Sequence, residues 1–256
     1  MALFISVVNH GHDEMISSST TLKNLAKRHT VIVKSNTQAQ PCLKNYCQKA
    51  DIHLIQGKGA KGFGANNNEV FDAAKGTFSM CDDDFFLVLN PDIEIFPEAL
   101  TLLLQQLKHT PADISAINLF RDSDMTVYDN SIRRYPELLT PLKTLLKLQR
   151  NDFYDKAILE DPIDIDWAAG SFLLFKAKCY ESLKGFDENY YMYFEDADIC
   201  TRANMAGYRV TYFPNIKAVH FASHKNRKLF SRHFFWYWTS AFRYHFRFPK
   251  NIRMNA

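Results

Sequence analysis

A cluster of acidic side chains follows directly after an aromatic run. The acids are Glu195, Asp196 and Asp198, and the aromatic run comprises Tyr190, Tyr191, Tyr193 and Phe194. A carboxylate at the start of a helix lies in the positive end of the helix dipole, which favours its ionised form. An ionised carboxylate beside aromatic walls can accept a proton from a bound hydroxyl group. Acidic residues also commonly cap helices, so this stretch alone is consistent with either role.

A helix is expected to begin at these acids and to hold them in place. Small residues recur at three- and four-residue spacing after the acids, and Gly207 is a typical helix stop. The small residues are Ala197, Cys200, Ala203 and Asn204.

The preceding chain alternates short apolar strands with helical stretches. Strands are expected at 3–8, 30–34, 53–55, 85–89 and 114–119, and helices at about 14–28, 65–74 and 97–109. This alternation is typical of an α/β domain with a mostly parallel sheet flanked by helices. Such sheets bind ligands at the carboxyl ends of their strands. The polar residues expected there are Asn9, Ser35, Asn36, the loop 57–64 and Asp92.

The loop GKGAKGFG, residues 57–64, matches the spacing of a dinucleotide-binding fingerprint. It follows the third expected strand rather than the first, and Lys58 and Lys61 make it basic. A glycine-rich loop before a helix lets any diphosphate approach the backbone, so a nicotinamide or flavin enzyme is the less favoured interpretation.

Composition bounds the class of protein. The chain has 256 residues, of which 46% are hydrophobic, and no apolar run approaches the length of a membrane span. The first residues read as a strand rather than a signal peptide, and the five cysteines have no C-x-x-C spacing. We therefore expect a cytoplasmic protein with reduced thiols.

The charge is distributed unevenly along the chain. Residues 1–198 carry 20 Lys and Arg against 28 Asp and Glu, whereas residues 199–256 carry 11 Lys and Arg and no acid. On a helical wheel the C-terminal segment separates four bases from a set of aromatic residues, with Trp236 and Phe246 as exceptions. The bases are Lys228, Arg232, Arg243 and Arg247, and the aromatic residues are Phe230, Phe234, Tyr237, Trp238, Phe242 and Tyr244.

Three interpretations of this basic segment are open. A helix of this kind can lie on a membrane surface, with its aromatics at the interface and its bases on anionic lipid. The aromatics could instead cover the core of the domain itself. The third interpretation, binding of nucleic acid through the bases and stacking aromatics, is the least favoured, because no recognisable nucleic-acid module accompanies the segment.

Several stretches, taken in order, resemble the family 2 glycosyltransferases with the GT-A fold. They are GFGANNN at 62–68, LNPDIEI at 89–95, residues 167–210 and His220, and the resemblance covers roughly residues 3–222. Within the family the chain is most similar to bacterial rhamnosyltransferases of O-antigen assembly. The resemblance implies a GT-A domain at 1–222. Within it, residues 121–165 interrupt the alternation of strands and helices with three prolines and a leucine-rich helix, and we expect them to form an inserted region on the acceptor side. Residues 223–256 would form a basic, aromatic extension.

The resemblance also implies a reaction. A sugar, most plausibly L-rhamnose from dTDP-L-rhamnose, would move with inversion onto a polyprenyl-diphosphate-linked sugar such as N-acetylglucosamine. The enzyme would work in lipopolysaccharide assembly as a peripheral protein on the inner face of the cytoplasmic membrane. The alternatives are transfer of another sugar, or a non-catalytic protein that binds nucleotide-sugars or membrane surfaces.

A departing nucleoside diphosphate needs a cation, and Mg²⁺ or Mn²⁺ with few protein ligands meets that need. By resemblance, Asp92 and His220 would hold this metal. Asn90 stands where the family's metal motif usually has a second acid, so one candidate ligand is neutral. Taken alone, Asp92 is consistent with a turn residue, and His220 with an ordinary histidine at a strand end.

The resemblance assigns the remaining site residues. Asp196 would be the general base and Glu195 its neighbour. The family usually has Asp-Asn where Ser35 and Asn36 stand, so the preferred base of the nucleotide is left open. Trp167 could stack on the acceptor or belong to the core, and Arg202 could face the diphosphate or solvent. The other residues placed near substrate are Asn9, Gly62, Phe63, Gly64, Asn66, Asn67, Asn68, Asn90 and Gly170, although the three asparagines could instead cap the helix.

Overall fold

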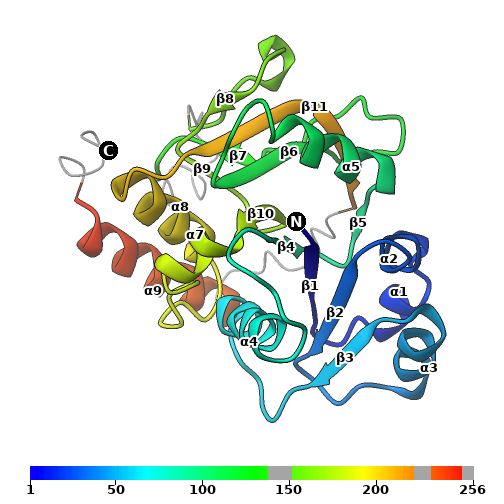
Figure 1. Ribbon diagram of the computed structural model, residues 1–256. Coiled ribbons are helices and arrows are strands. Elements are labelled where there is room, and N and C mark those ends of the chain that lie inside the picture. Colours follow the sequence, from blue (N-terminus) through cyan, green and yellow to red (C-terminus); the bar gives the residue numbers. More distant parts are fainter. Residues whose placement is uncertain (138–151, 222–231, 250–256) are drawn as a thin grey trace.

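The computed structural model describes residues 1–137, 152–221 and 232–249. A curled nine-stranded sheet runs through the protein, with helices on both faces (Figure 1). Within the described ranges, no helix is long and apolar enough to cross a bilayer. The leucine-rich helix expected within 121–165, and Lys228 and Phe230 of the basic segment, lie outside the described residues.

One half of the sheet is parallel, as the alternating pattern predicts. Strand β1 (Leu3–Asn9) pairs in parallel with β2 (Thr30–Ser35) and with β4 (Phe85–Leu89), and β2 pairs in parallel with β3 (His53–Gln56). The carboxyl ends of β1, β2 and β4 therefore meet at one edge of the sheet.

The other half corrects the expectation of a mostly parallel sheet. Strand β10 (Phe172–Lys176) is antiparallel to both β4 and β6 (Ile114–Phe120). Strand β11 (Val210–His220) is parallel to β6 but antiparallel to β5 (Ile93–Glu94) and β8 (Ile163–Asp164). The sheet is therefore mixed. A buried apolar run looks the same in either direction, so the sequence pattern did not reveal these orientations.

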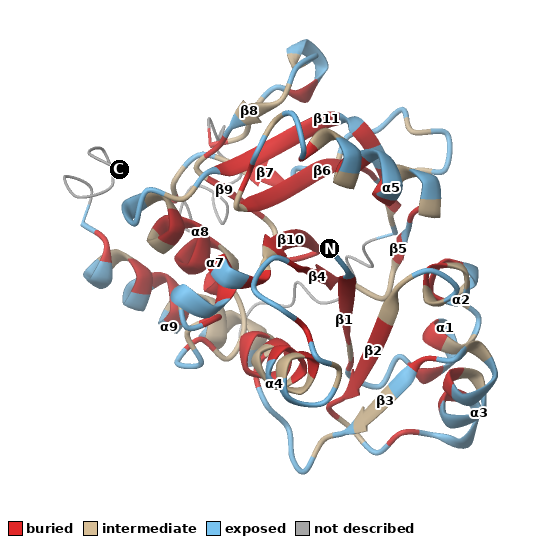
Figure 2. Cartoon of the chain, viewed as in Figure 1, coloured by how far each residue is buried: buried red, intermediate tan, exposed pale blue. Residues whose placement is uncertain are grey.

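Alternating side chains give the sheet two apolar faces. In β1, Leu3, Ile5 and Val7 join one buried cluster, whereas Phe4 joins the other. The first face is covered by α1 (Asp13–Ser17), α2 (Thr20–Ala26), α3 (Pro41–Ala50) and α5 (Pro97–Gln106). The second is covered by α4 (Phe63–Gly76), α7 (Ala177–Ser182), α8 (Glu195–Met205) and α9 (Arg232–Arg247). Figure 2 shows the central strands buried between these layers, whereas β3 at the edge of the sheet is partly exposed.

The helix expected at about 14–28 is divided in two. Ser19 adopts an extended conformation, and its side chain accepts a hydrogen bond from the Leu22 amide at 3.2 Å. This side chain caps α2, and the chain therefore breaks between α1 and α2.

A small second sheet brings the inserted region to the main body. Strand β7 (Ile132–Arg133) pairs antiparallel with β9 (Trp167–Ala168), so that Arg133 lies opposite Trp167. A short 3₁₀ turn (Lys156–Ile158) follows in the same region. Helix α8 contacts β9, so this small sheet lies beside the helix that carries Glu195 and Asp196.

Candidate active site

The register of β11 brings two distant residues together at the edge of the sheet. His220, the last residue of β11, pairs with Ile93 of β5, and the Phe221 amide donates to the carbonyl of Asp92 at 3.1 Å. As a result, His220 Nε2 lies 3.4 Å from Asp92 Oδ1. The structure thus joins the two residues that the resemblance assigned to a metal.

A third residue of this group was missed by the sequence analysis. Asp129 Oδ2 lies 2.6 Å from Nδ1 of His220, on the side of the ring opposite Asp92. Burial lowers the pKa of His220, but the hydrogen bond to Asp129 and the charge of Asp92 outweigh burial and raise it to about 9. Asp129 lies 91 residues from His220 in a region without a regular pattern, so no sequence signal pointed to it.

The donor set fits a divalent cation that is also bound by phosphate. Asp92 Oδ1 is buried and has no hydrogen-bond partner among the described residues, and it lies next to Nε2 of His220. The hydrogen bond between Asp129 and His220 fixes the orientation of the imidazole, as carboxylates commonly do for histidines that bind a metal through the other ring nitrogen. Among the described residues, no group of three or more His, Cys, Asp and Glu side chains converges to form a metal site, so a cation here would have Asp92 and His220 as its protein ligands.

A cavity of about 580 Å³ opens beside Asp92 and His220. The ends of β1, β2 and β4, the glycine loop and the first turns of α9 line it, and Asn36, Lys61, Phe63 and Asn90 contribute side chains. Asn36 also holds the glycine loop in place, because its side chain accepts from the Lys61 amide and donates to the Lys61 carbonyl, both at 2.8 Å. A nucleotide-sized ligand fits this position at the strand ends.

Two glycines let the loop after β3 pass close to its neighbours. A Cβ atom on Gly62 would lie 2.5 Å from the carbonyl oxygen of Tyr191, and one on Gly64 would lie 2.7 Å from Cβ of Phe186. The start of α4 therefore packs directly against the segment that precedes α8. Phe63 lies in the wall of the large cavity, and its ring is close to Gly170.

The three consecutive asparagines have different positions. Asn66 lies in the wall of the large cavity, and its buried Oδ1 has no hydrogen-bond partner among the described residues. Asn67 instead accepts from Ser6 at 2.7 Å, and Asn68 accepts from Tyr180 at 2.7 Å. Of the three asparagines that the resemblance places near the nucleotide-sugar, the structure brings Asn66 to the cavity but not Asn67 or Asn68.

Asn9 and Ser35 connect two strand ends. The Asn9 side chain donates to Oγ of Ser35 at 2.9 Å and accepts from the His12 amide at 2.8 Å. Both residues are buried, and neither lies in the wall of the large cavity. Asn9 and Ser35 therefore join the ends of β1 and β2 to each other, whereas the adjacent Asn36 lines the cavity itself.

Asp196 is held by backbone hydrogen bonds at the start of α8. Its Oδ2 accepts from the Gly170 amide at 3.0 Å, and its Oδ1 accepts from the Ala197 amide at 2.8 Å. Burial raises the pKa of Asp196, and these two hydrogen bonds and the Arg133 guanidinium oppose the rise. Gly170 thus has a clear role, which is to orient this carboxylate.

Glu195 differs sharply from its neighbour. It is buried, and its Oε2 has no hydrogen-bond partner among the described residues. Burial raises the pKa of Glu195 well above its usual range, and the charge of Asp196 adds to the rise. Burial therefore outweighs the helix dipole, contrary to the expectation that the dipole keeps these acids ionised. Asp196 ionises more readily than Glu195, because backbone hydrogen bonds stabilise its charged form.

A second cavity, of about 180 Å³, lies beside Asp196. Glu195, Asp196, Arg133 and Trp167 line it, together with aromatic residues of the segment before α8. The Arg133 guanidinium lies 5.1 Å from the Trp167 ring centroid, and the Trp167 indole donates to the Arg134 carbonyl at 2.8 Å. Trp167 is therefore largely buried, yet its edge reaches this cavity beside the candidate base.

The segment between the two cavities has an unusual backbone. Tyr193 and Phe194 have φ angles of 71° and 68°, and neither is a glycine. Each such residue costs on the order of 1–3 kcal/mol and persists only where its surroundings hold it. We call Tyr191–Phe194 the catalytic loop, because it leads directly into Glu195 and Asp196 and lines both cavities.

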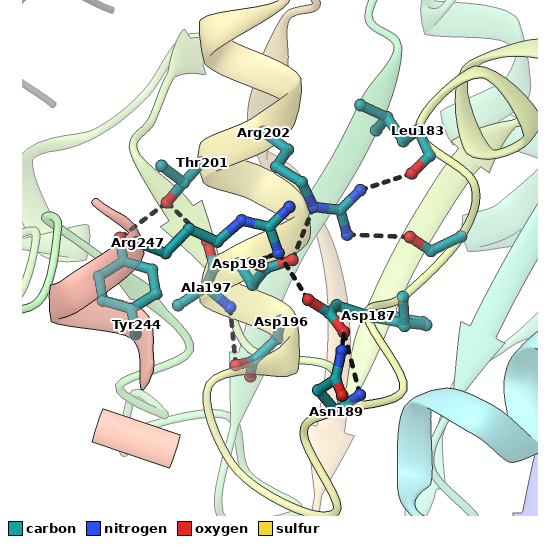
Figure 3. A network of polar contacts seen from close by, with 12 residues as sticks. Leu183, Asp187, Asn189, Asp196, Ala197, Asp198, Thr201, Arg202, Tyr244 and Arg247 are labelled. Carbon is teal, nitrogen blue, oxygen red and sulfur yellow. Dashed lines mark hydrogen bonds and ion pairs between the residues drawn. The ribbon is translucent and has the colours of Figure 1, made fainter. Parts of the chain in front are cut away.

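Arg202 does not reach either cavity. Its Nε donates to Asp198 at 2.6 Å, and its other nitrogens donate to the carbonyls of Leu183 and Gly185 (Figure 3). Asp198 is fully buried and also accepts from Arg247 of α9 at 3.0 Å. Arg202 thus stabilises the packing of α8, and the predicted contact with a diphosphate is not supported by its position.

Comparison with solved structures agrees with this architecture. The fold matches a crystal structure of GalNAc-T7 with UDP, GalNAc and Mn²⁺ at a TM-score of 0.65 and 12% identity, covering 99% of this chain and 49% of that one. At this identity the match concerns the fold alone, which is that of the GT-A glycosyltransferases.

Comparison of sequences identifies the family. The rhamnosyltransferase WbbL of Escherichia coli (strain K12) is 34% identical over 244 residues, which are 94% of this chain and 92% of that protein. The N-acetylglucosaminyl-diphospho-decaprenol L-rhamnosyltransferase of Mycobacterium tuberculosis (strain ATCC 25618 / H37Rv) is 29% identical over 156 residues, 56% of this chain and 48% of that protein. A family model described as "Glycosyl transferase family 2" matches residues 21–183. The chain therefore belongs to glycosyl transferase family 2 and is a glycosyltransferase.

Proposed function

We propose that this glycosyltransferase moves L-rhamnose from dTDP-L-rhamnose onto N-acetylglucosamine carried by a polyprenyl diphosphate, with inversion at the anomeric carbon. The names of two relatives support rhamnose as the sugar, and one of these names specifies an N-acetylglucosaminyl-diphospho-decaprenol acceptor. The observation that carries the proposal is the arrangement of two cavities that share the catalytic loop as a wall, with Asp92 and His220 in one and Asp196 in the other.

The large cavity would take the nucleotide-sugar. Asn36 and Lys61 lie at the end where β2 and the glycine loop meet, and the buried oxygen of Asn66 offers an acceptor for a hydroxyl or an imino group. Asp92 Oδ1 and His220 Nε2 would hold a divalent cation, Mg²⁺ or Mn²⁺. The cation would take the place of the proton on Nε2 of the imidazole. Such a cation neutralises the charge that develops on the departing diphosphate.

The small cavity would take the acceptor sugar. Asp196 would accept the proton of the attacking hydroxyl while its two backbone hydrogen bonds hold it in place. The hydroxyl oxygen then bonds to the anomeric carbon as the bond to the diphosphate breaks, which inverts that carbon in a single displacement. Burial and the neighbouring Asp196 raise the pKa of Glu195, which favours its protonated form, so Asp196 rather than Glu195 would accept the proton.

We further propose that the inserted region is the acceptor side of the domain and that the enzyme works at the cytoplasmic membrane face in O-antigen or related polysaccharide assembly. Arg133 of the inserted region lines the small cavity, and α9 carries exposed aromatic and basic residues. No nucleic-acid partner is proposed.

A donor screen tests the function. Purified protein would be given an N-acetylglucosamine-diphosphate-lipid acceptor, Mg²⁺ or Mn²⁺, and a panel of nucleotide-sugars that includes dTDP-L-rhamnose. We expect transfer from dTDP-L-rhamnose, which is lost in Asp196→Asn while donor binding remains. Transfer from another donor alone would overturn the choice of rhamnose, and unchanged transfer by Asp196→Asn would overturn the proposed base.

A further inference from the structure

Helix α9 presents two opposite aromatic faces, which the wheel of the sequence analysis did not separate. His233, Tyr237, Ser240 and Tyr244 recur at three- and four-residue spacing on the face that meets the domain, and Tyr244 is fully buried. A second row recurs at the same spacing on the opposite face, and we call it the outer stripe. The outer stripe consists of Phe235, Trp238, Phe242 and Phe246. Its phenylalanines are 62%, 51% and 85% exposed.

Helix α9 contacts every residue of the catalytic loop, through its inner face and through Trp236 beside that face. The ring centroids of Tyr191 and Trp236 lie 4.6 Å apart, and the carbonyl of Met192 accepts from Ser240 at 2.9 Å. The hydroxyl of Tyr193 lies 3.2 Å from Nδ1 of His233. The ring centroid of Phe194 lies 5.5 Å from the ring centroids of both Tyr237 and Tyr244.

These contacts explain why the loop keeps its geometry. Its two left-handed residues, Tyr193 and Phe194, come directly before the acids of α8 and need support from their surroundings. The far end of α9 is attached to α8 as well, where Tyr244 bonds to Thr201 at 2.7 Å and Arg247 bonds to Asp198 (Figure 3). The helix therefore acts as a positioning element for Asp196.

An anionic bilayer is the partner that fits the outer stripe. Arg232 and Arg243 are exposed on the same helix, and residues 199–256 contain no acid to oppose them. Aromatic side chains at the interface with bases on anionic headgroups are typical of helices that lie in the surface of a membrane. A second copy of the chain fits less well, because the basic residues beside two facing stripes would repel one another.

We propose that an anionic bilayer, bound by the outer stripe, holds α9 against the catalytic loop and thereby raises the rate of transfer. This inference rests on the proposed function, because the rate in question is that of the glycosyl transfer, and the lipid-linked acceptor would lie in the same bilayer. The membrane would then activate the enzyme in addition to anchoring it.

The outer stripe is tested with a short-chain, water-soluble acceptor, so that the bilayer is not needed to deliver the substrate. Phosphatidylcholine vesicles with and without phosphatidylglycerol are added to the full chain. We expect vesicles that contain phosphatidylglycerol to bind the protein and raise kcat about tenfold, as a shift of the loop population would. The triple variant Phe235→Ser, Phe242→Ser, Phe246→Ser should keep the basal rate and lose both effects. Phe96→Ser, at a phenylalanine 71% exposed before α5, is the matched control.

The inner face is tested by a single hydrogen bond. Ser240→Ala removes the contact with the Met192 carbonyl, whereas Thr239→Ala removes only a bond within α9. We expect Ser240→Ala to lower kcat several-fold at an unchanged KM for the donor and an unchanged Tm, and Thr239→Ala to change none of these. A merely structural role of Ser240 would lower Tm instead.

Hydrogen exchange separates this inference from the proposed function. Amides of residues 191–198 should exchange more slowly when wild-type protein is bound to the anionic vesicles, whatever sugar the enzyme transfers. Vesicle binding without slower exchange or a higher rate would make α9 an anchor only and overturn the inference. Failure to bind vesicles, or a dimer that the triple variant abolishes, would overturn the choice of a bilayer. Absence of transfer from every donor would contradict the proposed function, while the exchange result would still decide this inference.

Discussion

Asp129 and His220 form a partly buried pair, in which the carboxylate oxygen lies 2.6 Å from Nδ1 of the imidazole. The pair joins the inserted region to the end of β11, and it leaves Nε2 as the nitrogen that faces Asp92. The inserted region therefore contributes to both cavities, through Asp129 beside the large one and Arg133 within the small one.

Substitution of Asp129 should weaken metal binding without removal of a metal ligand. Asp129→Asn keeps the size of the side chain but loses the charge that orients and polarises His220. We expect the affinity for Mn²⁺ in the presence of dTDP to fall about 10- to 100-fold, which is the usual effect of losing a carboxylate that orients a metal-binding histidine. Isothermal titration with Mn²⁺ measures this change. Asp124→Asn, at an exposed position of the same region, is the control and should bind as the wild type does.

The two acids at the start of α8 should respond differently to neutralisation. Asp196→Asn removes the proposed base and should lower kcat by about 10²- to 10⁴-fold, with little change in donor affinity. Glu195→Gln should retain most of the activity, because burial already keeps Glu195 protonated. Initial rates at saturating donor and acceptor distinguish the two. An equal loss in both variants would contradict the assignment of roles.

Glu195 should also impose a pH dependence on stability. The pKa of Glu195 in the folded protein lies well above its value in the unfolded chain. The contribution of this carboxyl to stability is therefore fully present at pH values below the unfolded pKa, and it is lost as the pH rises towards the folded pKa. Glu195→Gln should therefore be more stable than the wild type at neutral pH, and the two should converge near pH ~4. The difference should grow by up to ~1.4 kcal/mol per pH unit, as expected for one proton. Urea unfolding at several pH values measures it, and the exposed Glu14→Gln should show no such trend.

The sequence predicted the elements of the fold better than their directions. The strands at β1, β2, β3 and β4 follow from short apolar runs, and the structure has them with nearly the same bounds. The antiparallel β10 could not be distinguished from a parallel strand, because a buried strand is apolar along its whole length. Strand direction is set by the connections, and the inserted region before β10 has no regular pattern from which to infer one.

The same limit applies to the candidate site. Asp92 and His220 could be paired from the resemblance, and the structure brings them together. Asp129 could not, because its contact depends on a long-range approach that local spacing does not encode. The resemblance places Asn66, Asn67 and Asn68 together near the nucleotide-sugar, but only the rotation of α4 decides which of their side chains faces the cavity.

The buried network at α8 predicts unequal costs for two arginines. Arg202 and Arg247 both bond to the fully buried Asp198, but their side chains are 15% and 41% exposed. Arg202→Met should lower the free energy of unfolding by about 3–5 kcal/mol, because a buried carboxylate loses its main partner. Arg247→Met should cost about 1 kcal/mol or less, because Arg202 remains and solvent screens the exposed pair. Urea unfolding followed by circular dichroism compares them. Donor affinity should be unchanged in Arg202→Met, and a large loss would restore the role of Arg202 at the diphosphate.

The close approach at Gly62 links donor binding to the catalytic loop. Gly62→Ala would place a methyl group against the carbonyl of Tyr191, where the Phe63 amide also donates at 3.1 Å. Because both partners are backbone atoms, neither can rotate away, and the start of α4 must separate from the loop. We expect a loss of stability of about 1–3 kcal/mol, typical of overpacking, and a clear loss of donor affinity. Gly59→Ala, where an added methyl group meets nothing within 4 Å, is the matched control in the same loop. Equal effects of the two substitutions would show that the glycine loop acts through its flexibility rather than through its contact with Tyr191.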